Sequence, residues 1–390
     1  MLKDFSLQAF SAGVLSAFVG FASSFFIILQ GLDAVGASPM EATSGLVALS
    51  LAMGLAGIYL SLTTKLPISV AWSTPGAALL ATTGALEGGF AAAVGAFIAT
   101  GALIVIAGLW KPLGRAVAKI PGALANAMLA GVLLTFCLAP IKAVAERPEL
   151  ALPIIAVWAL VWKLNRLYAV PAALAVTAAI ILWVTDLSTL DGLTWASAFT
   201  PELIFVTPTF STAAMIGIAV PLFIVTMASQ NIPGIAVLRA NDYKPAPGPL
   251  FAQTGLFSLA SAPFGGHAVN LAAITAAMCA GPDAHANPKR RYWSAVTAGA
   301  LYIVFGLAAG AIATFFAAAP SILITAVAGL ALLGAFAAAL SAAVQNEDDR
   351  IAAVITFLVT ASGVSFLGIG SAFWGLLAGL GMYGLSRWRA

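Results

Sequence analysis

The residues of this sequence best suited to chemistry stand in a short polar stretch, SVAWSTPGAALL at 69–80. Ser73 or Thr74 can cap a helix that begins near Pro75, because Pro lacks only an N–H group that the first turn leaves unpaired. The free N–H groups and positive dipole end of such a helix bind anions. A kink in a packed helix is the alternative interpretation. The candidate substrate contacts in this stretch are Trp72, Ser73, Thr74 and Gly76.

A second stretch of the same kind, SAPFGGHAVNLAAIT at 261–275, occupies the matching place in the second half of the chain. Its Pro and paired Gly favour an extended lead before a short helix that Asn270 would cap. Non-helical backbone at membrane depth is tolerated only where it is buried in protein or lines a cavity. Two such half-helices would aim their N-termini at one point. The stretch adds Phe264 and Asn270 as candidate substrate contacts.

Amides at the ends of two other apolar segments complete the candidate site. Gln30 ends the first segment, and Ser229, Gln230 and Asn231 end the eighth. A buried amide can equally bond a neighbouring helix, so packing and substrate binding both stay open for these residues. His267, which titrates near neutral pH, is the candidate for proton coupling. The alternative is a proton that crosses on the substrate carboxylate itself.

The composition identifies the elements that must position these residues as membrane-spanning helices. The chain has 390 residues, a mean hydropathy of +1.04 and 8% charged residues, against about 25% in soluble domains. Its surface must therefore face lipid, and its scattered basic residues do not indicate nucleic-acid binding. Cys137 and Cys279 lie in apolar segments and are expected to be small buried hydrophobes. This is an all-α polytopic membrane protein whose first helix is retained.

The sequence lacks the motifs that mark several other classes of protein. The sequence contains no HExxH, GxxxxGK[ST] or GxSxG motif and no cluster of His and carboxylates within an apolar segment. Nor does it contain a filter sequence or a ring of acidic residues typical of an ion channel. We therefore expect neither an enzyme nor an ATP-driven pump, and neither a metal nor a cofactor.

Polar and Pro/Gly breaks divide the chain into about fourteen segments. Several are too short to span a bilayer unaided, since thirteen helical residues cover only ~20 Å. The expected spans are 8–30, 43–62, 72–84, 89–109, 121–139, 150–163, 168–186, 211–231, 250–262, 268–281, 292–316, 320–341, 351–366 and 370–386.

Basic residues set the orientation of these segments. With both termini in the cytoplasm, only Lys142 and Arg147 of the 17 basic residues fall in outward loops, a strong positive-inside bias. The other 15 are Lys3, Lys65, Lys111, Arg115, Lys119, Lys163, Arg166, Arg239, Lys244, Lys289, Arg290, Arg291, Arg350, Arg387 and Arg389.

The two halves of the chain resemble each other at a nearly constant offset. Gln30 matches Gln230 at an offset of 200, and Pro67 matches Pro263 at 196. A repeat of seven segments must enter the membrane from the opposite side in its second copy, as the inverted repeats of secondary transporters do. The repeats are expected at 1–200 and 201–390. Further matches are Pro121 with Pro320 and Gly131 with Gly329, at offsets of 199 and 198.

Three long blocks resemble the bacterial benzoate/proton symporters, the BenE-type carriers. They are the opening (LQAFSAGVLSAFVGFASSFFIILQGLDAVGAS), LPISVAWSTPGAALLATTG and PFGGHAVNLAAITAAMCAGPDAH. That family is similar in fold to nucleobase carriers and to sulfate and bicarbonate exchangers. The resemblance implies a core domain near 1–112 and 208–317 and a gate domain near 113–207 and 318–390. Nucleobase carriers have carboxylates on segments eight and ten, where the matching stretches of this chain offer Ser229, Gln230 and Asn231, and then Asn270. Their loss suits an anionic substrate.

The sequence thus predicts a secondary transporter of the bacterial inner membrane that imports benzoate or a similar aromatic monocarboxylate with a proton. The alternatives are a carrier of the same fold for a nucleobase or another anion, and an uncoupled facilitative pathway. The expected partners are the substrate, the proton and membrane lipid. A homodimer is compatible with the sequence.

Overall fold

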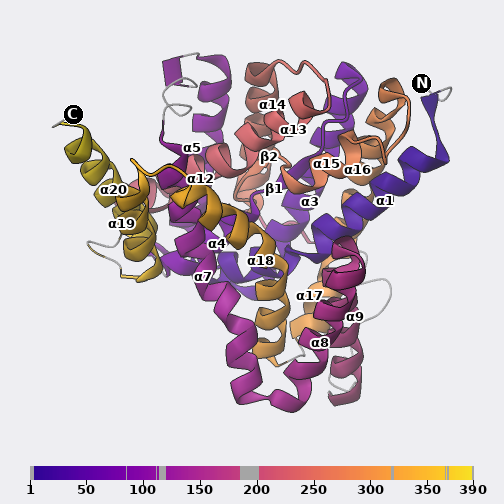
Figure 1. Ribbon diagram of the computed structural model, residues 1–390, viewed down its shortest axis with the longest axis horizontal. Helices are drawn as coiled ribbons and strands as arrows, with labels where there is room; N and C mark the ends of the chain where they lie inside the picture. The colour runs from indigo at the N-terminus through magenta and orange to yellow at the C-terminus, as the bar shows by residue number, and fades with distance from the viewer. Residues whose placement is uncertain are drawn as a thin grey trace.

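A computed structural model describes residues 4–84, 86–110, 112–113, 120–184, 202–317, 320–364, 366 and 369–388. Each predicted apolar range contains a helix (Figure 1). The boundary expected near residue 200 lies outside the described residues, as do Lys3, Lys111, Arg115, Lys119 and Arg389.

Two short strands at the centre of the molecule form its only sheet among the described residues (Figure 1). β1 (Val70–Trp72) pairs antiparallel with β2 (Val269–Leu271), with Ala71 opposite Asn270. A short helix follows each strand: α4 (Thr74–Thr83) after β1 and α15 (Ile274–Ala280) after β2. The extended leads predicted before two half-helices are therefore confirmed, and they pair with each other.

Two helix pairs flank the strands, and both approach closely through glycine. α3 (Pro39–Thr64) packs on α16 (Tyr292–Leu307), where Gly54 meets Gly299. α5 (Gly89–Leu109) packs on α14 (Pro247–Ser261), where Gly101 meets Gly255. Small residues at such crossings let backbones approach and gain van der Waals contact, which drives helix association in lipid.

The first and eighth segments are interrupted. The first consists of α1 (Leu7–Ala22) and α2 (Phe25–Ala34), separated at Ser23 and Ser24. The eighth runs through α11 (Thr212–Ala214), α12 (Val220–Thr226) and α13 (Ile232–Ala240), with π-helical turns at Met215–Ala219 and Met227–Asn231. Gln30, Ser229, Gln230 and Asn231 were predicted at helix ends and instead lie within these helical runs. This prediction was wrong because Gly31 and Pro233 do not end the helices.

The remaining helices form a second group, centred on α7 (Gly122–Glu146) and α18 (Ser321–Val344), which pack along each other. Figure 1 shows α7, α8, α9 and α18 extending away from β1 and β2. The other helices of this group are α8 (Pro148–Leu164), α9 (Ala169–Val184), α19 (Arg350–Ala361) and α20 (Ser371–Arg387). α17 (Ala309–Ala317) follows α16 and packs on α3 and α16.

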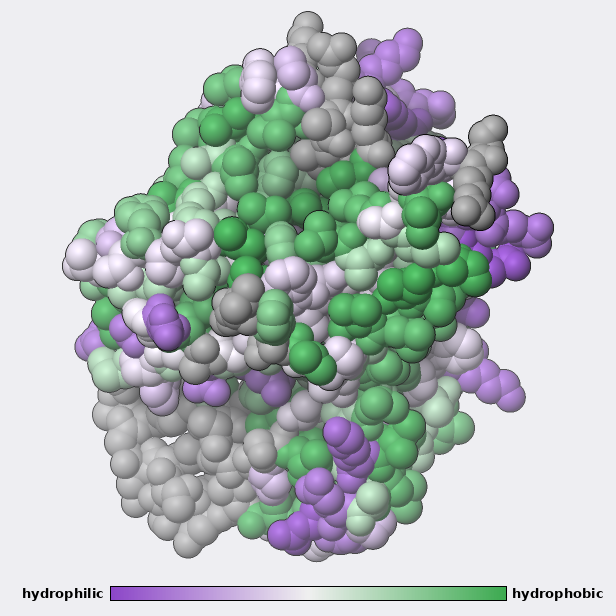
Figure 2. All heavy atoms as spheres, turned by 90° about the vertical axis from the view of Figure 1, so that its left-hand side faces the viewer, coloured by the Kyte–Doolittle hydropathy of each residue, from purple (hydrophilic) through white to green (hydrophobic). Residues whose placement is uncertain are grey.

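The surface of the molecule is apolar enough for lipid. Figure 2 shows hydrophobic residues over much of one side, with hydrophilic residues mainly toward its edges. Leu164 and Trp183 are 84% and 80% exposed. Among the described residues, six helical runs are long and apolar enough to cross a membrane alone. The number of membrane crossings stays a prediction.

Gly54→Ala is expected to destabilise the fold. An added Cβ would lie 2.5 Å from the Gly299 carbonyl oxygen, and such overpacking costs about 1–3 kcal/mol. Gly381→Ala is the control, because Gly381 lies in α20 with no atom within 4 Å of an added Cβ. It should be neutral or stabilising, since Ala favours helix. The measurement is thermal unfolding in detergent, and equal midpoints for both variants would contradict the close α3–α16 packing.

Candidate functional site

The paired strands bring the starts of α4 and α15 together. Hydrogen bonds continue beyond the strands, from Ser73 N to the Ala268 carbonyl at 3.0 Å and from Ala272 N to the Ser69 carbonyl at 2.9 Å. The backbone of both leads is thereby satisfied away from water, as a membrane interior requires. Because the strands are antiparallel, their helices leave in opposite directions from one central point.

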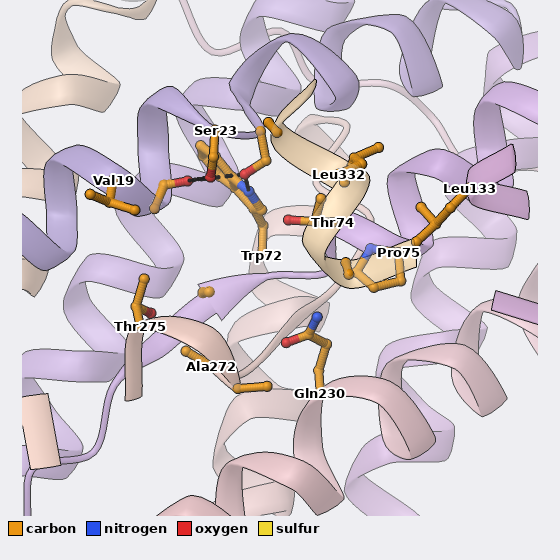
Figure 3. A pocket seen from close by; sticks show the side chains of 16 residues that line it. Val19, Ser23, Trp72, Thr74, Pro75, Leu133, Gln230, Ala272, Thr275 and Leu332 are labelled. Carbon is orange, nitrogen blue, oxygen red and sulfur yellow. Dashed lines mark hydrogen bonds between the residues drawn. The ribbon is translucent and has the colours of Figure 1, made fainter. Parts of the chain in front are cut away.

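A cavity of about 90 Å³ lies at this point (Figure 3), several times the ~10–15 Å³ that one water needs. Trp72 lines it from the end of β1, Thr74 and Pro75 from the start of α4, and Ala273 and Thr275 from the start of α15. None of the described lining residues carries a charge. The others are Val19, Gly20, Ser23, Ser24, Ala71, Leu133, Gln230, Ala272, Ala331, Leu332 and Ala335.

Polar and apolar groups enter the cavity from different parts of the structure. The hydroxyl and amide groups come from helices around the strands, including Ser23, Thr74 and Gln230. The helix group around α7 and α18 contributes only apolar side chains to the described lining. These include Leu133 from α7 and Leu332 from α18. Figure 3 shows Gln230 and Thr74 pointing toward the space between them. Such a cavity suits a ligand with one polar and one apolar end.

Trp72 is held in a fixed orientation at the cavity wall. Its indole Nε1 donates to Ser24 Oγ at 2.9 Å, and Ser24 Oγ donates to the Gly20 carbonyl at 3.0 Å. The Phe21 ring centroid is 5.3 Å from that of Trp72. The break between α1 and α2 thus supplies the hydrogen-bond partner of a 2% exposed Trp side chain.

Ser73 caps α4, as predicted, but does not line the cavity. Its fully buried Oγ accepts from Gly76 N at 3.1 Å and from Thr226 Oγ1 at 2.9 Å. Pro75 has no N–H, and the N–H of Gly76 is taken by the cap. Of the first-turn residues, Thr74 is the one whose hydroxyl faces the cavity (Figure 3).

The predicted Asn270 cap is wrong, because β2 continues through Leu271 and the helix begins only after Ala273. Asn270 is fully buried; its Nδ2 donates to the Leu271 carbonyl, and its Oδ1 has no hydrogen-bond partner. Asn231, also fully buried, accepts from Leu271 N at 2.9 Å. Asn231 therefore holds β2 in place, and neither Asn231 nor Asn270 lines the cavity.

The other candidate residues lie away from the cavity. Ser229 Oγ donates to the Val225 carbonyl of its own helix. Gln30 lies on α2, and its Oε1 is buried without a partner. Phe264 belongs to a 3₁₀ turn, Ala262–Phe264, and packs edge-on against Phe205 at 6.0 Å. Their roles in substrate binding stay predictions.

His267 lies behind the start of α4. It is fully buried, its Nε2 is 2.9 Å from the Ser73 carbonyl oxygen, and its Nδ1 has no partner. The ring of Phe97 packs edge-on against it at 6.2 Å. His267 therefore contacts the cap residue and does not line the cavity itself.

Sequence reasoning missed the residues supplied by the α1–α2 break and by the second helix group. Ser23 and Ser24 follow an apolar run without Pro, and its glycines at 13 and 20 lie within the helix, so no signal marks the break. Leu133 and Leu332 resemble every other Leu in their helices. Thr275 had a signal, since it is a polar residue one position into the second half-helix.

Broken helices that meet at an internal cavity define a membrane transporter fold. The transmembrane domain of the cyanobacterial bicarbonate transporter BicA is similar at a TM-score of 0.60 and 15% identity, covering 96% of this chain and 97% of that one. SLC26A9 is similar at a TM-score of 0.66 and 14% identity, covering 99% of this chain and 66% of that one.

The sequence comparisons give the family. The benzoate membrane transport protein family (BenE) matches residues 3–385, and the chain belongs to this family. It is 43% identical to the inner membrane protein YdcO of Escherichia coli K12 over 94% of this chain and 93% of that protein. It is 32% identical to the benzoate membrane transport protein of Acinetobacter baylyi over 98% and 95%. The chain is a membrane transporter, not an enzyme.

Ser73→Ala is expected to lower stability by about 1–3 kcal/mol, because the helix loses its cap and Thr226 loses its acceptor. Ser386→Ala, at an exposed position on α20, is the control and should change stability by less than about 0.5 kcal/mol. Thermal unfolding in detergent measures both. Unchanged stability of Ser73→Ala would contradict the capping role.

Proposed function

We propose that this chain imports benzoate or a similar aromatic monocarboxylate together with a proton across the inner membrane. The observation that carries the proposal is the cavity at the start of α4, polar on one side and apolar on the other. Membership of the family and the name of the Acinetobacter relative support benzoate as the substrate.

The substrate carboxylate is placed against the Thr74 hydroxyl and the Gln230 amide. α4 points its positive dipole end at this position, which favours an anion. The substrate ring then lies between Trp72 on one side and Leu133 and Leu332 on the other. Binding there removes the apolar surface of the ring and of these side chains from water, which is favourable. Neutral lining suits this anion, because a carboxylate in the wall would repel it.

Two inverted repeats are supported by the register of the strands. Ala71 lies opposite Asn270, which follows it by 199 positions, and the pairs on either side exchange under the same offset. Every antiparallel pair has such a local two-fold axis. What supports the repeats is that the axis here passes between residues whose offset lies within the 196–200 of the sequence matches.

Features farther from the strands also match between the two halves of the chain at an offset near 200. Pro121 and Pro320 both occupy the N-cap position, of α7 and α18 respectively. The Gly54–Gly299 contact corresponds to the Gly255–Gly101 contact, at offsets of 201 and 198. These correspondences favour fourteen segments, with a core domain around the strands and a gate domain around α7 and α18.

The positive-inside bias supports cytoplasmic termini, and the name of the Escherichia coli relative supports an inner-membrane location. For proton coupling, His267 remains the candidate because its Nδ1 has no partner and is free to take a proton. An anion at the start of α4 would stabilise the charged ring through their attraction. A proton carried on the substrate is the other route.

Two alternatives keep the fold and change the function. A nucleobase or another anion would compete with benzoate for the same cavity, and a competition panel against labelled benzoate separates these substrates. A facilitative pathway would show no accumulation against a gradient.

Thr74→Val is expected to weaken benzoate binding about 10- to 100-fold, because a hydrogen bond to a charged group contributes about 1.5–3 kcal/mol. Thr82→Val is the control, since the Thr82 hydroxyl donates to the Leu79 carbonyl within the same helix. Calorimetry on purified protein measures affinity, and uptake into proteoliposomes measures transport. Unchanged affinity in Thr74→Val would show that the carboxylate does not bind at Thr74. Uptake no greater than in protein-free liposomes would reject benzoate transport.

His267→Gln is expected to keep benzoate exchange and lose proton-driven accumulation, because Gln can still donate to the Ser73 carbonyl but takes no proton. His285→Gln, in an exposed loop, should keep both. The measurement is benzoate uptake into proteoliposomes with and without an inward proton gradient. Accumulation by His267→Gln at the wild-type level would assign the proton to the substrate.

A further inference from the structure

Tyr302, on α16, lies just behind the cavity wall and has a hydroxyl that neither the fold nor the proposed carboxylate site uses. Its side chain is 2% exposed, and its hydroxyl has no hydrogen-bond partner. Leaving a buried polar group unpaired is costly, and native structures rarely do so without a reason. The Tyr302 hydroxyl therefore has hydrogen-bonding capacity left for a partner that enters the neighbouring cavity.

The phenol reaches the wall because residue 20 is glycine. A Cβ at Gly20 would lie 2.3 Å from the Tyr302 hydroxyl oxygen and 3.2 Å from Thr275 Cγ2. The phenol oxygen therefore occupies the place that a side chain at position 20 would take. Gly20 and Thr275 both line the cavity, so Tyr302 lies directly behind this part of its wall.

Thr275 gives this part of the wall a second hydroxyl. Its Oγ1 shares a hydrogen bond with Ser69 Oγ at 3.2 Å. Thr275 is also a polar neighbour of the phenol, but that pair does not meet hydrogen-bond geometry. Together, Thr275 and Tyr302 form a neutral hydroxyl subsite. In Figure 3, Thr275 lies on the opposite side of the cavity from Leu133 and Leu332.

We propose that the Thr275–Tyr302 subsite binds a hydroxyl group on the substrate ring, so that the carrier accepts hydroxyl-substituted aromatic carboxylates in preference to benzoate. The inference rests on the proposed function, in which the start of α4 takes the carboxylate. Uncharged hydroxyl groups both donate and accept, which complements a phenolic substituent. An unsubstituted ring leaves the Tyr302 hydroxyl unpaired, and this difference generates the preference.

The test compares the dissociation constants of benzoate and of 2-, 3- and 4-hydroxybenzoate by calorimetry on the purified carrier. At least one hydroxybenzoate should bind more tightly than benzoate, about 2- to 10-fold, as one neutral hydrogen bond allows. Tyr302→Phe should reduce this preference by the same factor, and Thr275→Val should also reduce it. Thr275→Val serves as an independent variant if Tyr302→Phe does not fold.

Tyr292→Phe is the matched control, because Tyr292 lies on the same helix and donates to Asp4 Oδ2 instead. It should keep the wild-type preference. If benzoate binds and no hydroxybenzoate binds more tightly, the subsite is rejected while the proposed function stands. The same follows if the preference survives in both Tyr302→Phe and Thr275→Val. If neither benzoate nor any hydroxybenzoate binds, the proposed function itself fails.

Discussion

The hydrogen-bonded pairing of β1 with β2 is the interaction on which the rest of this structure depends. Extended backbone in the middle of a membrane protein has no water to satisfy its N–H and C=O groups, so it persists only where another segment pairs with it. Here each lead is the partner of the other, and the bonds from Ser73 N and Ala272 N extend the pairing to the start of each helix. The lead to each half-helix is thus held by the other half of the chain, which couples the two halves at the site.

Polar residues around the strands serve mainly to keep this backbone in place. Ser73 caps α4, Asn231 accepts from Leu271 N, and Ser258 Oγ accepts from Val269 N at 2.8 Å. The cavity is left to a few groups that are not consumed in this way, Thr74 and Gln230 among them. In the proposed anion site, the dipole of α4 provides the favourable field without a charged side chain. The buried hydroxyls hold that helix in position.

The sequence predicted the helices and the two extended leads from two local features. The length of an apolar segment must match the thickness of the bilayer, and Pro and Gly mark where helices are interrupted. The sequence also predicted that Ser73 or Thr74 caps a helix, since a cap is a local feature, and the structure selects Ser73. It missed the break at Ser23 and Ser24, where no helix-breaking residue stands, and the continuation of helix through Gln30 and Gln230. It could not select Leu133 and Leu332, because only the packing of α7 and α18 against the core distinguishes them. Features set by neighbouring residues, such as a helix cap, could be predicted from the sequence, whereas contacts between distant segments could not.

A structure of the carrier determined with bound benzoate tests the central claim most directly. The account predicts the carboxylate within hydrogen-bond distance of the Thr74 hydroxyl and the Gln230 amide, with the ring between Trp72 on one side and Leu133 and Leu332 on the other. The paired strands should be unchanged by the ligand. Benzoate bound away from the start of α4, or strands that separate when it binds, would contradict the account.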